Sequence, residues 1–558
     1  MHVFLFLLAF CVKQLVAVEL VVDLGYAKYR GLDFDNGVTR WAGMRYARSP
    51  SRLDGLRFTA PQDPLTDNGD ITSATEFGPL CIGTNNPVLY EVGGKWSEDC
   101  LFANVFAPTN ATTKSKLPVY VFIQGGGFNN NGNANFNGTD LVRASGKRIV
   151  VVNFNYRVGP YGFLASQEIV ANKTLSLNNG LKDQRQLLKW VNKHIDQFGG
   201  DPGHVTLGGA SAGAGSVVFQ LTAYGGRDDK LFQAATIESP ATPPLRNVTE
   251  SQFQYNALLK QTGCKNLQCL TTMNVVDFQN AVRSMNIPFP GAKNPPIYPF
   301  NPTIDYDFVQ DYTYNEFKNG HFVRVPTIIG DSTNEGLIFT TKSVSSLQKA
   351  YTFVADQFVN LDTKDQTSIE GVWQGPSDVS SDSRWRNVAA DIYGHIRYIC
   401  PGLNFSSAYA DSASVSTWQY RWNVGPALHV GELGSIWYNG TQASQVFVQQ
   451  YWISFIRSYN PNKYTTNYWT SDGAKMTSPK WETFGKTGNG RRLLFDDTNV
   501  VKMENVTDKE VNRCNVLSGM GLQLRQVAGA APRVGLDGVV LGLPHVVILI
   551  GLLHWLNT

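Results

Sequence analysis

The chain has 558 residues, of which 42% are hydrophobic and 17% charged, and its formal net charge is +3. This composition is typical of a folded globular protein with a large core. Because the charge is nearly neutral over this length and no Lys/Arg cluster stands out, nucleic acid is excluded as an expected partner. No linker divides residues 18–516, so we expect one large domain there.

An apolar run at residues 3–12 opens the chain, and the small Ala17 offers a cleavage point before Val18. This pattern predicts a secretory signal peptide over residues 1–17, since the run is too short to span a bilayer. A buried first strand or an anchor is the alternative. Seven N-x-S/T sequons fit an exported, glycosylated chain; they lie at Asn110, Asn137, Asn172, Asn247, Asn404, Asn439 and Asn505.

The cysteines also fit an oxidising compartment. Cys11 lies in the predicted signal peptide, and the six others can form three disulfides whose pairing the spacing leaves open. They are Cys81, Cys100, Cys264, Cys269, Cys400 and Cys514.

The C-terminus carries a second targeting pattern. An uncharged apolar run at residues 539–556 follows a short polar spacer and a patch of small residues at 528–531. A transmembrane helix usually has basic residues after its apolar run, and none follows here. The pattern therefore favours GPI attachment near Ala528 to Ala530 over a true span. We expect a linker over residues 517–538 and a hydrophobic tail over 539–558, and membrane contact only through this tail.

Strands and helices alternate through the first half of the chain. Leu117–Ile123 and residues 149–154 are near-continuous apolar runs, typical of strands covered on both faces. Residues 181–198 place apolar side chains on one face of a helix, and a short strand at 205–207 precedes a glycine-rich turn. This order predicts an α/β fold with a large, mostly parallel central sheet and helices on both faces.

Two further strands are expected at residues 325–329 and 417–424. Between them, the polar stretch at residues 362–382 is predicted to be a loop or a lid excursion.

The pattern G-x-S-x-G occurs at Gly209–Gly213, between the strand at 205–207 and an expected helix. This context predicts a nucleophile elbow, a strained turn that exposes the Oγ of Ser211 at a helix N-terminus and needs glycines where a Cβ would clash. The alternative is a flexible Gly/Ser/Ala-rich turn.

A serine nucleophile needs a base, and the base needs a carboxylate, in the chain order Ser, Asp/Glu, His for this kind of elbow. Position excludes six of the eight histidines, which lie in the terminal segments or precede the serine or the best carboxylates: His2, His194, His204, His321, His545 and His554. Of the other two, His395 has the pattern of a structural histidine in a packed helix. His429 lies in a loop after a strand, where α/β sites form, and is favoured. Asp331 and Glu335 both follow the strand at 325–329, and the spacing favours neither.

A second glycine run, Gly125-Gly126-Gly127, follows the strand Leu117–Ile123. It fits either a flexible turn or half of an oxyanion hole, where backbone N–H groups approach the substrate without a side chain in the way. The other half would be the N–H of Ala212, the residue after the nucleophile.

These blocks resemble the type-B carboxylesterase/lipase family, the cholinesterase-like α/β-hydrolases. The serine signature is matched at residues 198–213, and a second family signature is matched by EDCLFANV at 98–105. GGGF at 125–128, NYRVG at 155–159 and NEG at 334–336 also resemble family blocks, and the segment around His429 matches more loosely. The resemblance covers residues 37–514.

The resemblance implies further assignments. It favours Glu335 as the acid of a triad with Ser211 and His429, and it implies the disulfides Cys81–Cys100, Cys264–Cys269 and Cys400–Cys514. The chain departs from the family at Ala210, where a glutamate usually precedes the nucleophile, and at Gln124, where relatives often carry His or an aromatic residue. The loop between Cys81 and Cys100 is short and places Trp96 near its end, so neither a choline-stacking site nor strong interfacial activation is expected.

The sequence therefore predicts a secreted or cell-surface serine hydrolase that cleaves small-molecule or lipid carboxylic esters through Ser211, His429 and Glu335. The N–H groups of Gly126, Gly127 and Ala212 would form the oxyanion hole, without a metal or a cofactor. Two alternatives are a lipase for long-chain acyl lipids and a non-catalytic adhesion module on the same fold.

Overall fold

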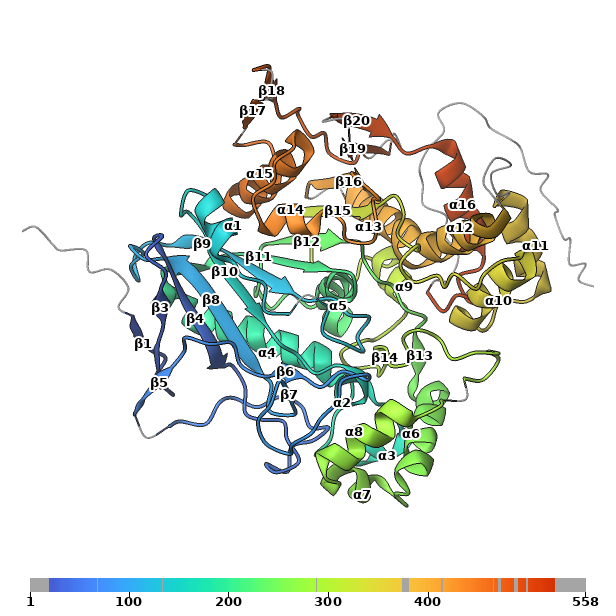
Figure 1. Ribbon diagram of the computed structural model, residues 1–558, viewed down its shortest axis with the longest axis horizontal. Coiled ribbons are helices and arrows are strands. Elements are labelled where there is room, and N and C mark those ends of the chain that lie inside the picture. Colours follow the sequence, from blue (N-terminus) through green and yellow to red (C-terminus); the bar gives the residue numbers. More distant parts are fainter. Residues whose placement is uncertain are drawn as a thin grey trace, which may run out of the picture.

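A mixed sheet of eleven strands forms the centre of the computed structural model (Figure 1). The model describes residues 20–526 except 68, 133, 288, 374–380, 413–414, 465, 470–472, 486–489 and 498–499. The strands run in the order β20 (Val501–Asn505), β19 (Arg491–Asp496), β16 (Thr417–Asn423), β15 (Thr327–Ser332), β12 (Ala234–Glu238), β11 (Gly200–Ala210), β9 (Leu117–Ile123), β10 (Val150–Phe154), β8 (Phe102–Pro108), β4 (Val38–Arg45) and β3 (Leu32–Asp33).

Every pairing from β10 through β19 is parallel, and the antiparallel pairings lie toward the two edges. The predicted fold, with a large and mostly parallel sheet, is confirmed.

The sheet separates two hydrophobic cores. In β9, Val119, Val121 and Ile123 pack into one core, whereas Tyr120 and Phe122 pack into the other. Successive side chains of a strand point to opposite faces, so a strand covered on both faces is apolar at nearly every position. This burial explains the continuous apolar runs in the sequence.

Helices cover both faces, as predicted (Figure 1). One core contains residues of α4 (Asn179–His194), α5 (Ala212–Gly226) and α13 (Cys400–Ser412), and the other contains residues of α1 (Thr139–Ala144), α14 (Leu433–Trp437) and α15 (Ala443–Ser458). The expected helix at 181–198 corresponds to α4 and a 3-10 turn, Ile195–Phe198.

Smaller elements surround this body. The minor strands are β1 (Val21–Asp23), β2 (Lys28–Arg30), β5 (Ile71–Ser73), β6 (Leu80–Cys81), β7 (Trp96–Ser97), β13 (Arg246–Asn247), β14 (Thr303–Ile304), β17 (Asn467–Trp469) and β18 (Lys475–Thr477). The outer helices are α2 (Gly159–Phe163), α3 (Gln167–Ala171), α6 (Val248–Thr262), α7 (Leu267–Thr272), α8 (Val275–Ser284), α9 (Thr313–Lys318), α10 (Leu347–Gln357), α11 (Thr363–Val372), α12 (Ser381–Gly394) and α16 (Asp508–Gly519), and a π-helical turn, His395–Ile399, joins α12 to α13.

Helix α11 corrects the loop predicted at residues 362–382. The Asp362 side chain accepts a hydrogen bond from the Asp365 N–H, and Asp365 accepts one from the Asp362 N–H, which forms a capping box at the helix start. Ile369 is buried and anchors the helix to the body. The loop prediction was wrong because a capping box and a few contacts with the body, among them the hydrogen bond from Arg513 to the Val372 carbonyl oxygen, hold a mostly polar helix. Residues 374–380 of that stretch lie outside the described residues.

Three disulfides staple the fold in the pairing that the resemblance implied: Cys81–Cys100, Cys264–Cys269 and Cys400–Cys514. The last pair joins the start of α13 to α16, which are 114 residues apart in the chain. The C-terminal helix is therefore covalently held against the sheet's helical cover.

The last described residue, Gln526, packs against the body, and its side-chain amide donates to the carbonyl oxygens of Thr242 and Ile396. The predicted signal peptide, GPI attachment region and tail lie in residues 1–19 and 527–558, outside the described residues. Within the described ranges, no helix is both long and apolar enough to cross a bilayer.

Candidate active site

Ser211 lies between β11 and α5 in a strained backbone conformation, with φ 59° and ψ −122°. The turn is tight on both sides: a Cβ on Gly213 would overlap the carbonyl oxygen of Ile123, and one on Gly209 would lie 2.5 Å from the Gly213 carbonyl carbon. The Ser211 N–H donates to the Glu238 carbonyl oxygen at 2.9 Å, which fixes the turn against β12. The local geometry is that of a nucleophile elbow rather than a flexible turn.

The glycine run after β9 has the backbone of a tight loop. Gly126 and Gly127 have φ of +114° and +63°, and the Gly126 carbonyl oxygen accepts from the N–H groups of Asn129 and Asn130 at 3.1 and 2.9 Å. A Cβ on Gly127 would overlap the ring of Tyr298. Among the described residues, the N–H groups of Gly126, Gly127 and Ala212 donate no hydrogen bond, so all three are free to bind an oxyanion.

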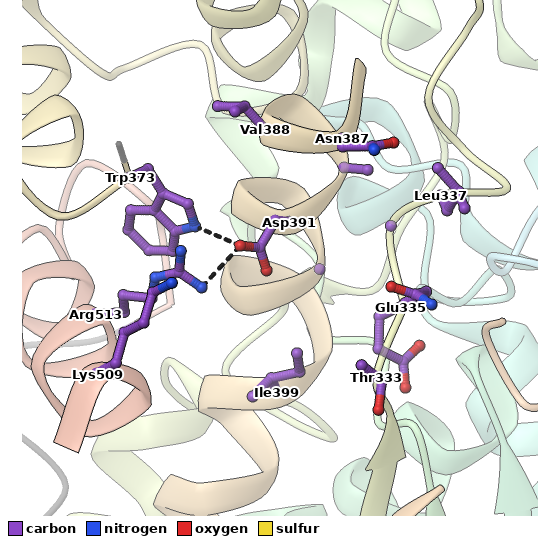
Figure 2. Close-up of a pocket in the computed structure, with 14 residues that line it drawn as sticks. Thr333, Glu335, Leu337, Trp373, Asn387, Val388, Asp391, Ile399, Lys509 and Arg513 are labelled. Atoms are coloured by element: carbon purple, nitrogen blue, oxygen red, sulfur yellow. Dashed lines mark hydrogen bonds and ion pairs between the residues drawn. The ribbon is translucent and has the colours of Figure 1, made fainter. Parts of the chain in front are cut away.

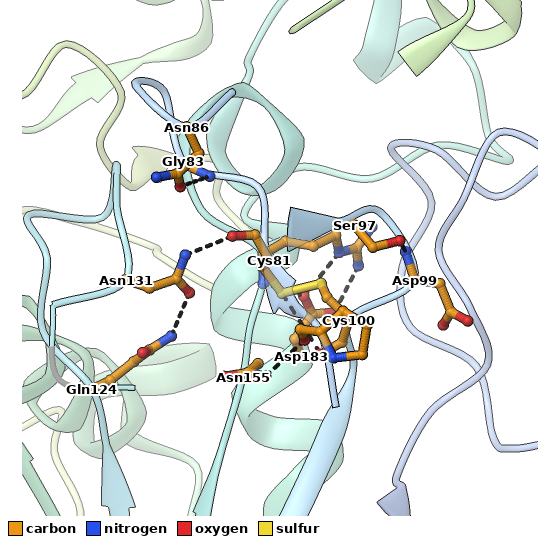
Figure 3. The surroundings of a disulfide bond; sticks show 12 residues. Cys81, Gly83, Asn86, Ser97, Asp99, Cys100, Gln124, Asn131, Asn155 and Asp183 are labelled. Carbon is orange, nitrogen blue, oxygen red and sulfur yellow. Dashed lines mark hydrogen bonds and ion pairs between the residues drawn. A yellow bond between two sulfur atoms is a disulfide. The ribbon is translucent and has the colours of Figure 1, made fainter. Parts of the chain in front are cut away.

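The loop closed by the Cys81–Cys100 disulfide supports this glycine run (Figure 3). The Asn131 side-chain amide donates to the Cys81 carbonyl oxygen at 2.5 Å, and the Gln124 amide donates to Asn131 Oδ1 at 2.9 Å. Gln124, which departs from the usual residue of the family, directly precedes Gly125. Through Asn131, its side chain connects the start of the glycine run to the disulfide loop.

Glu335 and His429 form a buried pair. His429 Nδ1 contacts Glu335 Oε2 closely, and Glu335 Oε1 accepts hydrogen bonds from the Ser239 hydroxyl at 2.7 Å and the Ser332 N–H at 2.6 Å. Three donors thus hold the carboxylate in one orientation. The Asn334 N–H donates to the Ala427 carbonyl oxygen at 2.8 Å, which clamps the acid loop to the histidine loop.

The His429 ring is packed between Tyr398 and Phe339, with ring centroids 4.3 and 5.1 Å away. Its Nε2 is buried and has no hydrogen-bond partner among the residues that the structure describes, so no hydrogen bond joins it to Ser211. The structure therefore orients the imidazole through Nδ1 and leaves Nε2 free to take a proton.

The competing candidates have other partners. Asp331 lies inside β15 and pairs with Arg421, because the strand continues past residue 329 to Ser332. His395 contacts Asp391, with Nδ1 2.9 Å from Oδ1, in the π-helical turn before α13. Both are structural groups, as sequence reasoning expected for His395 and left open for Asp331.

Two buried carboxyl groups behind the elbow were not predicted. Glu238 pairs in register with Ala210 on the neighbouring strand, so its side chain points to the same face of the sheet as Ala210. Burial raises its pKa well above the ordinary value, and Trp452 Nε1 donates to its Oε1 at 3.2 Å. A carboxyl group is therefore present beside Ala210 although the usual glutamate is absent. The available signal was an acid at the last position of the apolar strand β12.

Glu432 is the second of these groups and lies three residues after His429. Burial raises its pKa to about 7, and it accepts hydrogen bonds from the hydroxyls of Tyr420 and Ser332. Ser332 also binds Glu335 through its backbone, which links Glu432 to the acid of the pair.

A cavity of about 540 Å³ lies on the other side of the acid loop, between α12, α16 and Glu335 (Figure 2). In its lining, Asp391 accepts a hydrogen bond from Trp373 Nε1 at 3.1 Å and pairs with Arg513 at 2.7 Å. Neither Ser211, His429 nor the glycine run lines it. This cavity is therefore not where an ester carbonyl would meet the serine.

Known proteins resemble the chain over most of its length. The model of the Carboxylesterase family matches residues 19–514. Lipase 2 of Geotrichum candidum is 28% identical over 499 residues, which cover 79% of this chain and 88% of that protein. The para-nitrobenzyl esterase of Bacillus subtilis (strain 168) is 30% identical over 482 residues, covering 80% and 92%. The crystal structure of Aspergillus niger EstA superposes with a TM-score of 0.82 and 37% sequence identity, covering 90% of this chain and 99% of that one.

The chain thus belongs to the carboxylesterase family, as its motifs predicted. It is a carboxylic-ester hydrolase with the α/β-hydrolase fold.

Proposed function

We propose that Ser211, His429 and Glu335 act as a catalytic triad. Ser211 Oγ attacks the ester carbonyl, and His429 Nε2 takes the hydroxyl proton as the new C–O bond forms. Glu335 holds the imidazole with its proton on Nδ1 and stabilises the imidazolium. The N–H groups of Gly126, Gly127 and Ala212 stabilise the tetrahedral oxyanion.

Collapse of this intermediate breaks the bond to the alcohol, which leaves with the proton from His429. Water then attacks the acyl-enzyme, with His429 as base, and releases the carboxylic acid and free Ser211. The observation that carries the proposal is the Glu335–His429 contact with a free Nε2, combined with a strained serine at a helix N-terminus.

A substrate panel of ethyl esters from acetate to palmitate, followed by titration of the released acid, tests the proposal. We expect the purified full-length protein to hydrolyse short esters with a smooth saturation curve. Ser211→Ala is expected to reduce kcat by about 10⁴- to 10⁶-fold with unchanged folding. Equal rates for wild type and Ser211→Ala would contradict the proposed triad.

The same panel addresses the lipase alternative. A rate that rises sharply above the critical micelle concentration of long-chain esters would favour a lipase. Secreted relatives are named as lipases, including secreted lipase 4 of Gibberella zeae, which is 29% identical over 466 residues. The absence of any hydrolysis by a folded protein would favour the adhesion alternative.

We also propose that the chain is exported, glycosylated and held at the cell surface by its C-terminal tail. Support comes from the sequence patterns at both ends and from five sequons whose asparagines are exposed: Asn110, Asn137, Asn172, Asn439 and Asn505. Asn247 caps α6 through its side chain, and Asn404 is half-buried in α13, so we expect low occupancy at both. Release by a phosphatidylinositol-specific phospholipase would support a GPI anchor, and retention would favour a true span.

A further inference from the structure

We propose that the enzyme binds esters whose acyl part ends in a carboxylate, and that Arg246 and Arg397 hold this carboxylate in a pocket beside the oxyanion loop. The inference rests on the proposed function and specifies the substrate class of the same site. The pocket is lined by both arginines and by Tyr298 and Asn301, among other residues.

Arg397 is buried without an ion-pair partner. Its residue is only 4% exposed, and neither its Nε nor its Nη2 has a hydrogen-bond partner among the described residues. The guanidinium carbon lies 5.6 Å from the ring centroid of Tyr298, and the guanidinium has a side-chain hydrogen bond with Tyr398, but among the described residues no carboxylate pairs with it. An unpaired buried cation is costly, so the site favours an anion.

Arg246 reaches the same pocket from β13. It is 8% exposed and lies between aromatic rings, with its guanidinium carbon 4.9 Å from the Phe289 centroid and 5.9 Å from that of Phe253. Burial lowers its pKa to about 10, so the side chain is charged at neutral pH. The nearby acid, Glu250, is already paired with Arg525 at 2.5 Å.

Most other buried arginines among the described residues pair with a carboxylate; Arg40 is an exception and donates to the Thr75 carbonyl oxygen. Arg57 pairs with Glu98 at 2.5 Å, and Arg157 pairs with Asp183 at 2.7 Å. The two arginines of the pocket therefore differ from the way this fold treats most other buried cations, and a ligand carboxylate would supply the missing partner through charge-assisted hydrogen bonds.

The pocket lies next to the atoms that would hold the acyl group. Tyr298 fills the space where a Cβ of Gly127 would be, which puts the pocket wall against the oxyanion loop. The segment that carries Arg246 starts at the elbow, because the Ala241 N–H donates to the Ser211 carbonyl oxygen at 3.1 Å. The next residue along, Thr242, donates its N–H to the Arg397 carbonyl oxygen at 3.0 Å. One short segment thus connects Ser211 to both arginines.

The free volume of the pocket is about that of one water molecule, which is less than a carboxylate needs, so a bound carboxylate must push the lining side chains apart, and a bulky anion is excluded. Asn301 adds an unpartnered buried acceptor, its Oδ1, beside the arginines. This oxygen would repel one carboxylate oxygen unless a water or the protonated acid bridges it, so the arginines must supply the binding energy. Half-esters of short dicarboxylic acids are the smallest substrates that could bridge the two sites, with the ester carbon at Ser211 and the distal carboxylate at the arginines.

Kinetics with matched esters test the assignment. Monoethyl glutarate and ethyl valerate have the same acyl length and differ by the terminal carboxylate. The third ester, 3-acetoxypropanoate, is ethyl acetate with a carboxylate on its alcohol part, so its charge lies on the alcohol side of the ester bond. For wild type we expect kcat/KM to be about 10- to 100-fold higher for the half-ester than for ethyl valerate. Arg397→Gln and Arg246→Gln should each lower this ratio of kcat/KM values at least tenfold. Their kcat/KM for ethyl valerate should stay within about twofold of the wild-type value. Arg283→Gln, at an exposed position, is the matched control.

Equal kcat/KM for the acidic and neutral esters, a preference for charge on the alcohol, or a parallel loss on both esters in the variants would overturn the assignment. A binding measurement separates failure of the proposed triad from failure of the carboxylate pocket, because glutarate binding does not require catalysis. Calorimetry of glutarate with Ser211→Ala should detect binding that is lost when Arg397→Gln is added, whether or not wild type hydrolyses any ester. If Arg397→Gln does not fold, Arg246→Gln gives the same comparison. No glutarate binding to Ser211→Ala would contradict the subsite by itself.

Discussion

The substitution Glu335→Gln tests how the buried carboxylate acts on His429. A glutamine has the same shape and can keep its oxygen at the position of Oε1, where it still accepts from the Ser239 hydroxyl and the Ser332 N–H. Its amide nitrogen then takes the place of Oε2 and points an N–H at His429 Nδ1. Two donors cannot face each other, so His429 must move its proton to Nε2, the atom that has to accept the proton of Ser211.

The expected loss follows from this change of tautomer. Removing the charge and reversing the hydrogen bond at a triad histidine costs on the order of 10⁴ in kcat, or about 5.5 kcal/mol of transition-state stabilisation. KM should change little, since the contacts of the ester with the oxyanion loop remain. Ser239→Ala removes only one hydrogen bond to the carboxylate, and we expect a loss of about 10- to 100-fold in kcat.

The assay is steady-state hydrolysis of a short ethyl ester between pH 6 and 9, with circular dichroism to check folding. Asp331→Asn is the matched control because it removes the other carboxylate that the sequence offered. It breaks the pair with Arg421 and should lower stability by about 3–5 kcal/mol. Its folded fraction should keep kcat within about tenfold. A Glu335→Gln enzyme within tenfold of wild type, or an Asp331→Asn enzyme that loses 10⁴-fold while folded, would refute the assignment of Glu335.

Further outcomes follow from the packing of the site. Burial raises the pKa of Glu432 to about 7, so the stability that its protonated form contributes is complete below pH 4 and is lost as the pH rises to 7. In urea titrations, the wild-type free energy of unfolding should therefore fall by about 3 kcal/mol between pH 4 and 8 relative to that of Glu432→Gln. Parallel pH profiles for the two proteins would contradict this. Gly213→Ala places a Cβ on the carbonyl oxygen of Ile123 and should destabilise the protein by more than about 3 kcal/mol or prevent its folding, as thermal melts and soluble yield would report. Replacing Cys81 and Cys100 together by serine should cost about 2–4 kcal/mol and weaken the support of the oxyanion loop, so that kcat falls along with stability; unchanged kcat would show that the loop holds its shape without the disulfide.

The elbow was predictable from sequence because the G-x-S-x-G pattern lies between an apolar strand and a helix. The clash that excludes a side chain at Gly209 is local, with Gly213 in the first helical turn, whereas the clash at Gly213 is with Ile123 on the neighbouring strand β9 and depends on the fold. The chain order of the triad then favoured His429, and the structure gives His395 a different partner. The sheet was equally predictable, since strands buried on both faces are recognisable as continuous apolar runs.

Other features depend on contacts between distant segments. Asp331 and Glu335 lie close in sequence, and only the pairing of Asp331 with Arg421, on the next strand, separates them. Arg246 and Arg397 belong to β13 and to the π-helical turn, which are distant in the chain, and they line one pocket; no local pattern marks either residue. Helix α11 was missed for the opposite reason: its capping box is local, but the stretch is too polar to show a helical face.

The central claim is that Ser211 is the activated nucleophile of this hydrolase, and reaction with a fluorophosphonate tests it most directly. Wild-type protein and Ser211→Ala would be incubated with the reagent, digested and analysed by mass spectrometry. We predict one adduct per wild-type chain, on the peptide that contains Ser211, and none on the variant. A folded wild-type protein without an adduct, or an adduct on another residue that persists in Ser211→Ala, would contradict it.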